Sequence, residues 1–214
     1  MIGGVAVLGE PMGLRDRKKD RTRRLVHGTA LGIFAERGYD NVTVEDVAEA
    51  CDLSRATIFR YFPTKEHLVV GLEPERLEDL REAFEERPAD EAVFTSICHA
   101  LVAVAQRYED QRDEMLVVRS IVQGNDALQA RAEGLRADWR TAFADLISQR
   151  VRPGDSPSEG DGSDLRVRVL AGAVLAALSV AVEEWLASDR PARLADVLAE
   201  AMGILGAGFD PDPR

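Results

Sequence analysis

Residues 43–68, "TVEDVAEACDLSRATIFRYFPTKEHL", contain two short helical patterns with only "CDL" between them. Thr43 precedes the first pattern and Asp46 follows it at the third position, which is a variant of the capping box that begins many helices. Ser54 is a suitable N-cap for the second pattern. Pro63 ends that pattern, because proline disfavours helical geometry in the residue before it. The stretch therefore predicts two short helices joined by a tight turn.

The second of these helices has two chemically different sides. Ile58 and Phe62 fall on one side and can pack on a core, whereas Arg55, Thr57 and Tyr61 fall elsewhere. A short helix that carries guanidinium and hydroxyl groups on its surface can reach the edges of bases in a DNA groove. Helix-turn-helix proteins place their second helix in the major groove in this way. The pattern therefore favours a DNA-reading helix.

The rest of the chain is also predicted to be helical. Aromatic residues make up only 6 % of the 214 residues, Ala and Leu dominate the apolar set, and no strand pattern or internal repeat occurs. We therefore expect an all-α fold. Pro74 predicts a break near Leu72 in the helix that starts at residue 65. The expected helices cover residues 20–37, 44–50, 55–62, 65–87, 91–108, 112–123, 126–151, 169–182 and 194–205.

Charge is distributed unevenly along the chain. The net charge of −11 by itself argues against a polyanionic partner. Residues 1–70, however, carry 11 Lys and Arg against 10 Asp and Glu, and residues 71–214 carry 16 against 28. The segment "RDRKKDRTRR", residues 15–24, has seven basic and two acidic residues. A basic arm thus opens an otherwise acidic chain, and we expect it to contact the DNA backbone or the minor groove.

The sequence has no signature of several other classes of protein. It contains no nucleophile elbow, phosphate loop, dinucleotide-binding glycine pattern or His-rich metal pattern, so we expect no enzymatic activity, no cofactor and no metal. Cys51 and Cys98 lie in helical patterns without metal-type spacing, which indicates neither zinc nor a disulfide framework. The N-terminus has no basic region before its apolar run, and residues 169–182 are fewer than the roughly 20 of a membrane span. We therefore expect a cytoplasmic protein without membrane contact.

The segment "FAERGYDNVTVEDVAEACDLSRATIFRYFPTKEHL" resembles the DNA-binding domain of the TetR family of transcriptional regulators, and the resemblance covers about residues 21–70. It implies an N-terminal three-helix helix-turn-helix domain followed by a larger helical domain for ligand binding and dimerisation. The start "MGLRDRKK" at Met12 is similar to a usual start of such chains, so residues 1–11 are expected to be dispensable for operator binding. The expected division is a basic, disordered arm over residues 1–19, a DNA-binding domain over 20–66 and a regulatory domain over 67–214, with a mobile loop over 152–163.

The resemblance also assigns DNA contacts by position. Arg55, Ala56 and Thr57 match the base-facing start of the recognition helix, and Arg55 is expected to read guanine through O6 and N7. Other matching positions usually hold phosphates or lie at the groove margin. The full expected set is Arg17, Lys18, Lys19, Arg21, Thr43, Ser54, Arg55, Ala56, Thr57, Arg60, Tyr61 and Lys65.

Two residues depart from the family pattern. Asp52 stands in the turn where the family usually has glycine, which predicts a left-handed backbone conformation at some cost in energy. Phe59 replaces a more common tyrosine and removes one hydroxyl that could hold a phosphate. We expect the fold to tolerate both.

The last two helices are expected to dimerise the protein. Residues 169–182 are apolar on every side and residues 194–205 carry an apolar stripe, so these helices can form a four-helix interface with a second copy. The alternative is that they only fill the core of a single chain. A dimer would place two recognition helices about 34 to 36 Å apart, in successive major grooves.

The middle helices are expected to bind an effector. The resemblance implies a small-molecule pocket, lined here by Phe94, Ile97, Leu101, Met115, Leu116, Trp139 and Phe143, although each of these residues alone also fits plain core packing. Such a lining favours a mostly apolar ligand. Arg119, alone within "MLVVRSIV", is expected either to meet a buried carboxylate or to receive an anionic ligand. The region is also similar to actinobacterial-type members of the family whose ligands include acyl-CoA thioesters.

The expected function is therefore a dimeric repressor that binds a palindromic operator and is released by its effector. The alternative is a helical ligand-binding or interaction module without specific DNA binding. Binding to upstream DNA that weakens steeply as salt rises distinguishes the two.

Overall fold

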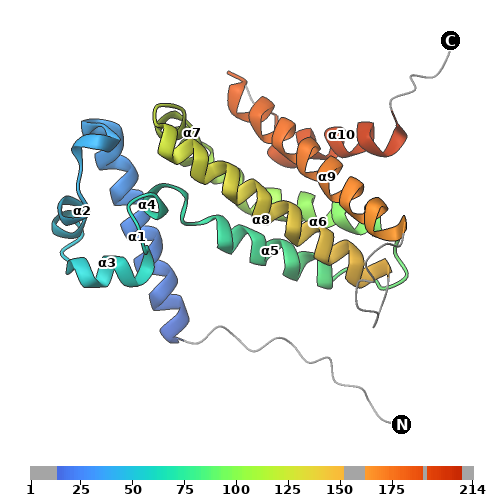
Figure 1. Ribbon diagram of the computed structural model, residues 1–214, viewed down its shortest axis with the longest axis horizontal. Coiled ribbons are helices and arrows are strands. Elements are labelled where there is room, and N and C mark those ends of the chain that lie inside the picture. The colour runs from blue at the N-terminus through green and yellow to red at the C-terminus, as the bar shows by residue number, and fades with distance from the viewer. Residues whose placement is uncertain (1–13, 152–161, 190–191, 209–214) are drawn as a thin grey trace, which may run out of the picture. The chain divides into compact units, whose positions relative to one another are not determined.

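The computed structural model describes residues 14–151, 162–189 and 192–208, and these residues form helices without strands (Figure 1). The chain divides into two compact units, and the boundary lies between Val69 and Val70. This boundary lies within α4 (His67–Val70), three residues beyond the expected one. The extension over residues 1–11 and most of the expected loop, residues 152–161, lie outside the described residues.

The first unit begins with α1 (Leu14–Arg37), which is longer than expected. Residues 14–19 were predicted to be disordered, but they form the first turns of this helix. Residues 14–20, "LRDRKKD", contain neither proline nor glycine and are rich in strong helix formers, so nothing in them stops the helix. At the other end, Gly38 adopts a φ of 82°, and its N–H donates to Phe34 O at 2.9 Å. Gly38 therefore ends the helix with a positive φ, which glycine adopts without strain.

Two short helices, α2 (Val44–Ala50) and α3 (Arg55–Tyr61), follow after a single 3₁₀ turn, η1 (Tyr39–Asn41). The predicted capping box is present, because Thr43 Oγ1 accepts from Asp46 N at 3.2 Å and Asp46 Oδ2 accepts from Thr43 N at 2.7 Å. Ser54 Oγ accepts from the backbone N–H at position 57, at 3.1 Å. Asp52 has a φ of 53°, which confirms the left-handed turn between the two helices. The tight turn expected from the sequence is thus formed.

The core of this unit holds α3 by one side only. Ile58 and Phe62 are 0 % and 1 % exposed. His27 of α1 is also buried, and its Nδ1 lies 2.9 Å from Leu68 O of α4. Because the anchoring residues share one side of α3, its other side faces outward. The buried apolar side chains that surround this anchor are Val26, Ala30, Leu31, Phe34, Val42, Val44, Val47 and Ala48.

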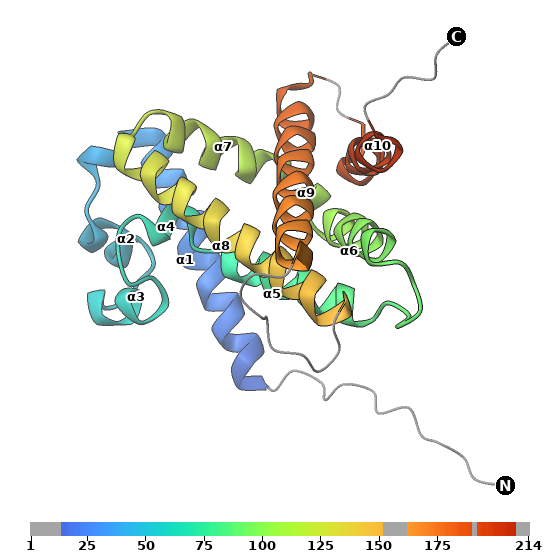
Figure 2. The ribbon, with the colours of Figure 1, turned by 45° about the vertical axis from the view of Figure 1, so that its right-hand side comes forward.

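In the part of the chain that the structure describes, the second unit contains six α-helices and one 3₁₀ turn (Figures 1 and 2). They are α5 (Glu73–Glu85), α6 (Val93–Tyr108), the 3₁₀ turn η2 (Glu109–Gln111), α7 (Arg112–Gln123), α8 (Asp126–Val151), α9 (Gly162–Ala187) and α10 (Leu194–Ala207). In both views α9 runs beside α8 and α10 lies beside α6. The ends of α7 and α8 match the sequence prediction, and the break near Leu72 separates α4 from α5 as Pro74 predicted.

Side chains distant in sequence cap the last two helices. The Arg112 guanidinium donates to carbonyl oxygens at the end of α9, with the shortest bond, 2.6 Å, to Ser188 O. The Glu109 carboxylate accepts from the N–H of Ala195 at 3.2 Å, in the first turn of α10. Helix ends leave such groups unpaired, and a cation at a C-terminus or an anion at an N-terminus is favourable. These contacts hold α9 and α10 in place.

A cluster around Glu91 precedes α6. The Glu91 carboxylate accepts from Arg87 at 2.6 and 2.8 Å, from Ser96 Oγ at 2.8 Å, and lies 2.8 Å from His99 Nδ1. The hydrogen bonds from Arg87, followed by those from Ser96 and His99, lower the pKa of Glu91 to about 2. The pKa of a glutamate in an unfolded chain is about 4.3. Because the folded pKa is lower, the ionised carboxylate of Glu91 stabilises the fold.

Acid is therefore expected to weaken this contribution. It is complete above the unfolded pKa of about 4.3, and it is lost as the pH falls through the folded pKa of about 2. Glu91→Gln should be less stable than wild type at pH 5, and the gap should narrow at pH 4 and again at pH 3. Urea midpoints of both proteins at the three values measure this gap. A gap that stays constant contradicts the assignment.

Candidate nucleic-acid interface

The outward side of α3 carries the residues expected to reach DNA. Arg55, Ala56 and Arg60 are exposed, as is the N-cap Ser54, whereas Thr57 is half-buried. Tyr61, also half-buried, is the last residue of the helix. The structure thus places the expected base-facing residues together in the first turn of α3, with Arg55 and Ala56 exposed.

The Arg55 guanidinium has two neighbours. Arg55 Nη1 lies 2.6 Å from Glu45 Oε1 of α2, and Arg55 Cζ lies 5.1 Å from the centre of the Phe59 ring. The side chains of Arg55 and Glu45 are 63 % and 54 % exposed, so the pair remains open to solvent and to a DNA groove. Arg55 therefore stands at the surface with a defined orientation.

Two hydroxyl groups expected to contact DNA take part in capping. Thr43 Oγ1 donates to Asp46 Oδ2 at 2.5 Å, and the hydroxyls of Ser54 and Thr57 lie 2.9 Å apart. Hydrogen bonds from the Thr43 side chain and backbone lower the pKa of Asp46, so its carboxylate stays an acceptor. For the Thr43 hydroxyl to donate to a phosphate, it must first give up its hydrogen bond to Asp46.

Lys65, which was also expected to hold a phosphate, contacts the protein itself. Its Nζ donates to Tyr39 O at 2.6 Å and lies 4.1 Å from the centre of the Tyr39 ring and 5.8 Å from that of Phe34. An ammonium group has three donors, so two remain for a phosphate. The sequence did not indicate this packing role, because Tyr39 and Lys65 are distant along the chain.

The basic arm lies on the first turns of α1. Lys18, Lys19 and Arg21 are exposed, and Arg17 belongs to the same helix. A helix is too wide for the minor groove, which is about 6 Å across. The helical form therefore favours contacts with phosphates over insertion into the minor groove.

The sequence interpretation missed Glu45 and Phe59 as neighbours of Arg55. The signal for Phe59 was present, since residues four apart share one side of a helix. No signal identified Glu45, because its contact with Arg55 depends on how α2 packs against α3.

The residues expected to line an effector pocket differ in their burial. Ile97, Leu101 and Phe143 are 1 %, 2 % and 0 % exposed and belong to the closed core of the second unit. Trp139 is partly buried, with its ring centre 5.9 Å from that of Phe143. Phe94, Met115 and Leu116 are also partly buried and pack against this core. An effector that uses all of these residues must therefore open the core.

Arg119 lies on α7 and is only half-buried. Among the residues that the structure describes, no carboxylate pairs with it, so the expected buried ion pair is not formed. None of the apolar residues of α7 is fully buried either. The charge is therefore tolerated here because the side chain reaches water.

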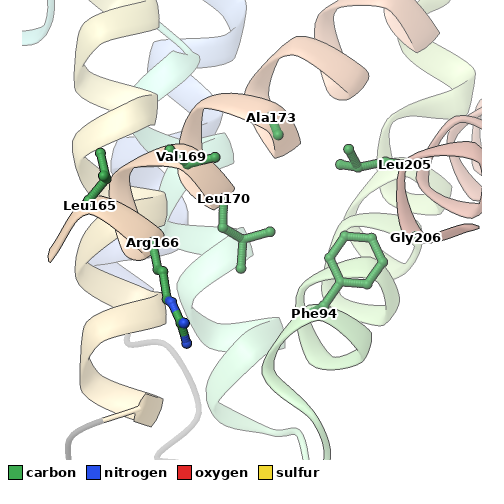
Figure 3. Close-up of a pocket in the computed structure, with 8 residues that line it drawn as sticks. All are labelled: Phe94, Leu165, Arg166, Val169, Leu170, Ala173, Leu205 and Gly206. Atoms are coloured by element: carbon green, nitrogen blue, oxygen red, sulfur yellow. The ribbon is translucent and has the colours of Figure 1, made fainter. Parts of the chain in front are cut away.

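A groove of about 580 Å³ lies between the start of α6, the first half of α9 and the end of α10 (Figure 3). The side chains of Phe94, Leu170 and Leu205 face this space. A Cβ atom added at Gly206 would lie 2.8 Å from Phe94 Cε1, so glycine permits the close approach of the ring to α10. Only Phe94 of the expected pocket residues lines this groove. Its lining is Phe94, Leu165, Arg166, Val169, Leu170, Ala173, Leu205 and Gly206.

The groove continues into an exposed apolar surface of α9. Leu165, Val169 and Val180 are 63 %, 62 % and 63 % exposed, and Ile204 of α10 is 54 % exposed. The segment Leu165–Ala187 has 23 residues, and its most apolar window of 18 residues has a mean hydropathy of 1.9, so it could cross a membrane by length and composition alone. The expectation that the apolar run is too short for a span was therefore wrong. Only 22 % of its most apolar window is buried within the chain.

No metal site was expected, and among the described residues no three His, Cys, Asp or Glu side chains are placed to hold a metal ion. Cys51 and Cys98 are both free thiols.

Two family models match the chain. The model of bacterial regulatory proteins of the tetR family matches residues 28–72, and the model of the MftR C-terminal domain matches residues 91–210. The first covers the helix-turn-helix described above, and the second covers α6 to α10.

Individual proteins agree with these matches. MftR of Mycobacterium tuberculosis, which is named for regulating mycofactocin biosynthesis, is 25 % identical over 194 residues, covering 91 % of this chain and 94 % of its own. The HTH-type transcriptional regulator TcmR of Streptomyces glaucescens is 32 % identical over 178 residues, covering 81 % of this chain and 76 % of its own.

A solved structure shares the fold. Thermus thermophilus FadR, described as a TetR family transcriptional repressor in complex with lauroyl-CoA, superimposes with a TM-score of 0.52 at 22 % identity, covering 90 % of this chain and 98 % of its own. The helix-turn-helix, the larger helical unit and the matches over both of them lead to one conclusion. The chain belongs to the TetR family of transcriptional regulators.

Proposed function

We propose that two copies of this chain bind a palindromic operator, each laying its α3 into the major groove, and that a small effector releases them. The observation that carries this proposal is the two-sided α3, in which Ile58 and Phe62 anchor the helix while Arg55 stands at the surface. Thermus thermophilus FadR is a repressor, and this supports repression as the outcome here. Occupancy of an operator blocks transcription sterically.

Dimerisation is proposed through α9 and α10. Leu165, Val169 and Val180 form an exposed apolar stripe on α9, and Ile204 adds to it from α10. A monomer rarely exposes such a continuous surface, which favours a protein partner. A twofold axis through this surface buries the stripe of each copy against that of the other.

A lipid bilayer is the less favourable cover for this stripe. The opposite side of α9 packs in the core, where Ala171 and Val174 are 0 % exposed, and α8 runs alongside α9. The sequence of α8, "DALQARAEGLRADWRTAFADLISQRV", carries many charged residues. A membrane around α9 would bring these charges toward hydrocarbon, which costs several kcal/mol for each. We therefore propose a cytoplasmic dimer that has access to the chromosome.

The proposed effector is small and mostly apolar, and acyl-CoA is one candidate. The FadR structure contains lauroyl-CoA, and the core of the second unit here is lined by Ile97, Leu101 and Phe143. Met115 and Leu116 of α7, which are partly buried, pack against this core. An effector that binds better when the core is open shifts the population toward a conformer with misplaced recognition helices.

The test of this function is the replacement of Arg55. Arg55→Ala is expected to cost roughly 1–3 kcal/mol of operator binding and to relax the preference at one base pair, because a bidentate contact with guanine is lost. Fluorescence anisotropy with the operator and with a scrambled duplex, over a range of salt, measures both effects. The operator comes from selection of bound fragments of the source genome.

Lys18→Ala is the matched control, since it removes an exposed charge that lies on α1 and not on the recognition helix α3. It should weaken binding to both duplexes alike and reduce the salt dependence. Equal losses on operator and scrambled DNA for Arg55→Ala contradict the base-reading role. A wild-type protein with no preference for any fragment supports a ligand-binding module without specific DNA binding.

A further inference from the structure

Glu45 places a carboxylate on the surface proposed to face DNA. Its Oε1 lies 2.6 Å from Arg55 Nη1, and both side chains are more than half exposed. A carboxylate in this position is unfavourable for binding a polyanion, because it repels phosphates. Glu49, also exposed on α2, makes no contact with Arg55. Glu45 thus has a fixed partner, Arg55, whereas Glu49 of the same helix is a solvated charge.

The geometry leaves part of the Arg55 fork open. A guanidinium carries five N–H donors in one plane, and Glu45 engages Nη1. The edge formed by Nε and Nη2 remains, and two parallel donors are what guanine O6 and N7 require. The Phe59 ring, 5.1 Å from Arg55 Cζ, limits rotation of the plane from another side. Holding a long side chain in one orientation reduces the entropy lost when it binds.

We propose that Glu45 is a positioning residue that sets the base preference of Arg55, and this inference rests on the proposed function. Glu45 turns the open edge of Arg55 toward guanine. Its negative charge also repels the phosphates of any duplex that approach Arg55, and unmatched bases do not offer two acceptors to the open edge. Guanine can bind without displacing the ion pair. Glu45 therefore lowers the affinity for unrelated DNA more than the affinity for the operator.

The experiment compares the full-length wild type with Glu45→Gln and with Glu49→Gln as the matched control. Both variants remove one exposed negative charge from α2, but only the first removes the partner of Arg55. Anisotropy with the selected operator and with a scrambled duplex gives the ratio of the two affinities. Glu45→Gln is expected to reduce this ratio roughly two- to fivefold, the range of coupling of an exposed ion pair. Glu49→Gln should strengthen both complexes slightly and leave the ratio unchanged.

The Arg55→Ala background tests whether Glu45 acts through Arg55. There, the further change Glu45→Gln should leave the ratio unchanged, because the residue that it positions is absent. A second readout replaces the contacted guanine of the operator by 7-deazaguanine, which lacks the N7 acceptor. Wild type should lose more affinity on this duplex than Glu45→Gln does. Thermal unfolding followed by circular dichroism should show that all Glu45 and Glu49 variants are folded, with a slightly lower midpoint for Glu45→Gln because Glu45 lies in the first turn of α2.

The outcomes separate this inference from the function on which it rests. A wild type that prefers the operator, together with a Glu45→Gln variant of unchanged ratio, overturns the inference alone. An equal fall of the ratio in the Arg55→Ala background also overturns it, since Glu45 then acts without Arg55. A wild type without preference for any duplex overturns the proposed function and this inference together.

Discussion

Replacement of Val169 and Val180 together by glutamate is expected to give a folded monomer that binds the operator at least about 100-fold more weakly than wild type. The two side chains are 62 % and 63 % exposed on α9, three turns of helix apart. In the proposed dimer they lie against the second copy, where a carboxylate without a partner costs several kcal/mol. In a dimer, binding of one recognition helix raises the effective concentration of the second helix at its half-site. A monomer lacks this gain, so its single recognition helix binds more weakly.

Light scattering coupled to size-exclusion chromatography measures the mass, and anisotropy measures operator binding. Val151→Glu is the matched control, because Val151 is 50 % exposed at the end of α8 and lies off the α9 stripe. This control should remain a dimer with the affinity of wild type. A double variant that stays dimeric shows that the interface lies elsewhere. A wild type recovered only with membranes or detergent favours lipid as the cover of α9.

Phe62→Ala is expected to destabilise the first unit by roughly 3–5 kcal/mol and to abolish operator binding. Phe62 is 1 % exposed, and it is one of the two residues that anchor α3. Its ring lies near His27, with 6.4 Å between ring centres, and below the guanidinium of Arg23 at 5.7 Å. Truncation leaves a cavity beneath the recognition helix, and the small core around it offers few residues that could close the cavity.

The positions of the two tryptophans allow the stability of the first unit to be measured separately from that of the second. Trp139 and Trp185 both lie in the second unit, so tryptophan fluorescence reports on that unit, whereas circular dichroism reports on both. In Phe62→Ala, the part of the circular dichroism change that comes from the first unit should occur at lower urea. The urea midpoint of tryptophan fluorescence, which reports the second unit, should be unchanged. Phe62→Leu should lose much less, because it keeps most of the buried volume. A Phe62→Ala variant that loses less than about 1 kcal/mol contradicts the anchoring role.

Local signals in the sequence predicted much of the first unit. The Thr43 capping box and the Ser54 cap depend on residues within four positions of one another, and both are present. The left-handed Asp52, which the resemblance to the family implied, is present as well. The ends of α7 and α8 were predicted for the same reason, since their periodicity and flanking residues are local. The start of α1 was placed too late at residue 20, because basic residues form helices and disordered arms equally well.

Contacts between distant segments could not be predicted in this way. Whether Lys65 meets a phosphate or Tyr39 depends on the path of the chain between them. The burial of Ile97 and Phe143 depends on how closely α6 and α8 pack, which the periodicity of each helix does not express. The 23-residue apolar segment of α9 was underestimated because residues 165–168 include two arginines that interrupt the run.

The sequence by itself determined that the protein is helical, that α2 and α3 form a helix-turn-helix, and that Arg55 begins the second of these helices, because caps and turns are encoded by neighbouring residues. Only the tertiary structure decided which groups surround Arg55 and which side of α9 stays uncovered. Side-chain partners such as Glu45 are selected by the packing of whole helices, and that packing is the joint result of residues far apart in the chain.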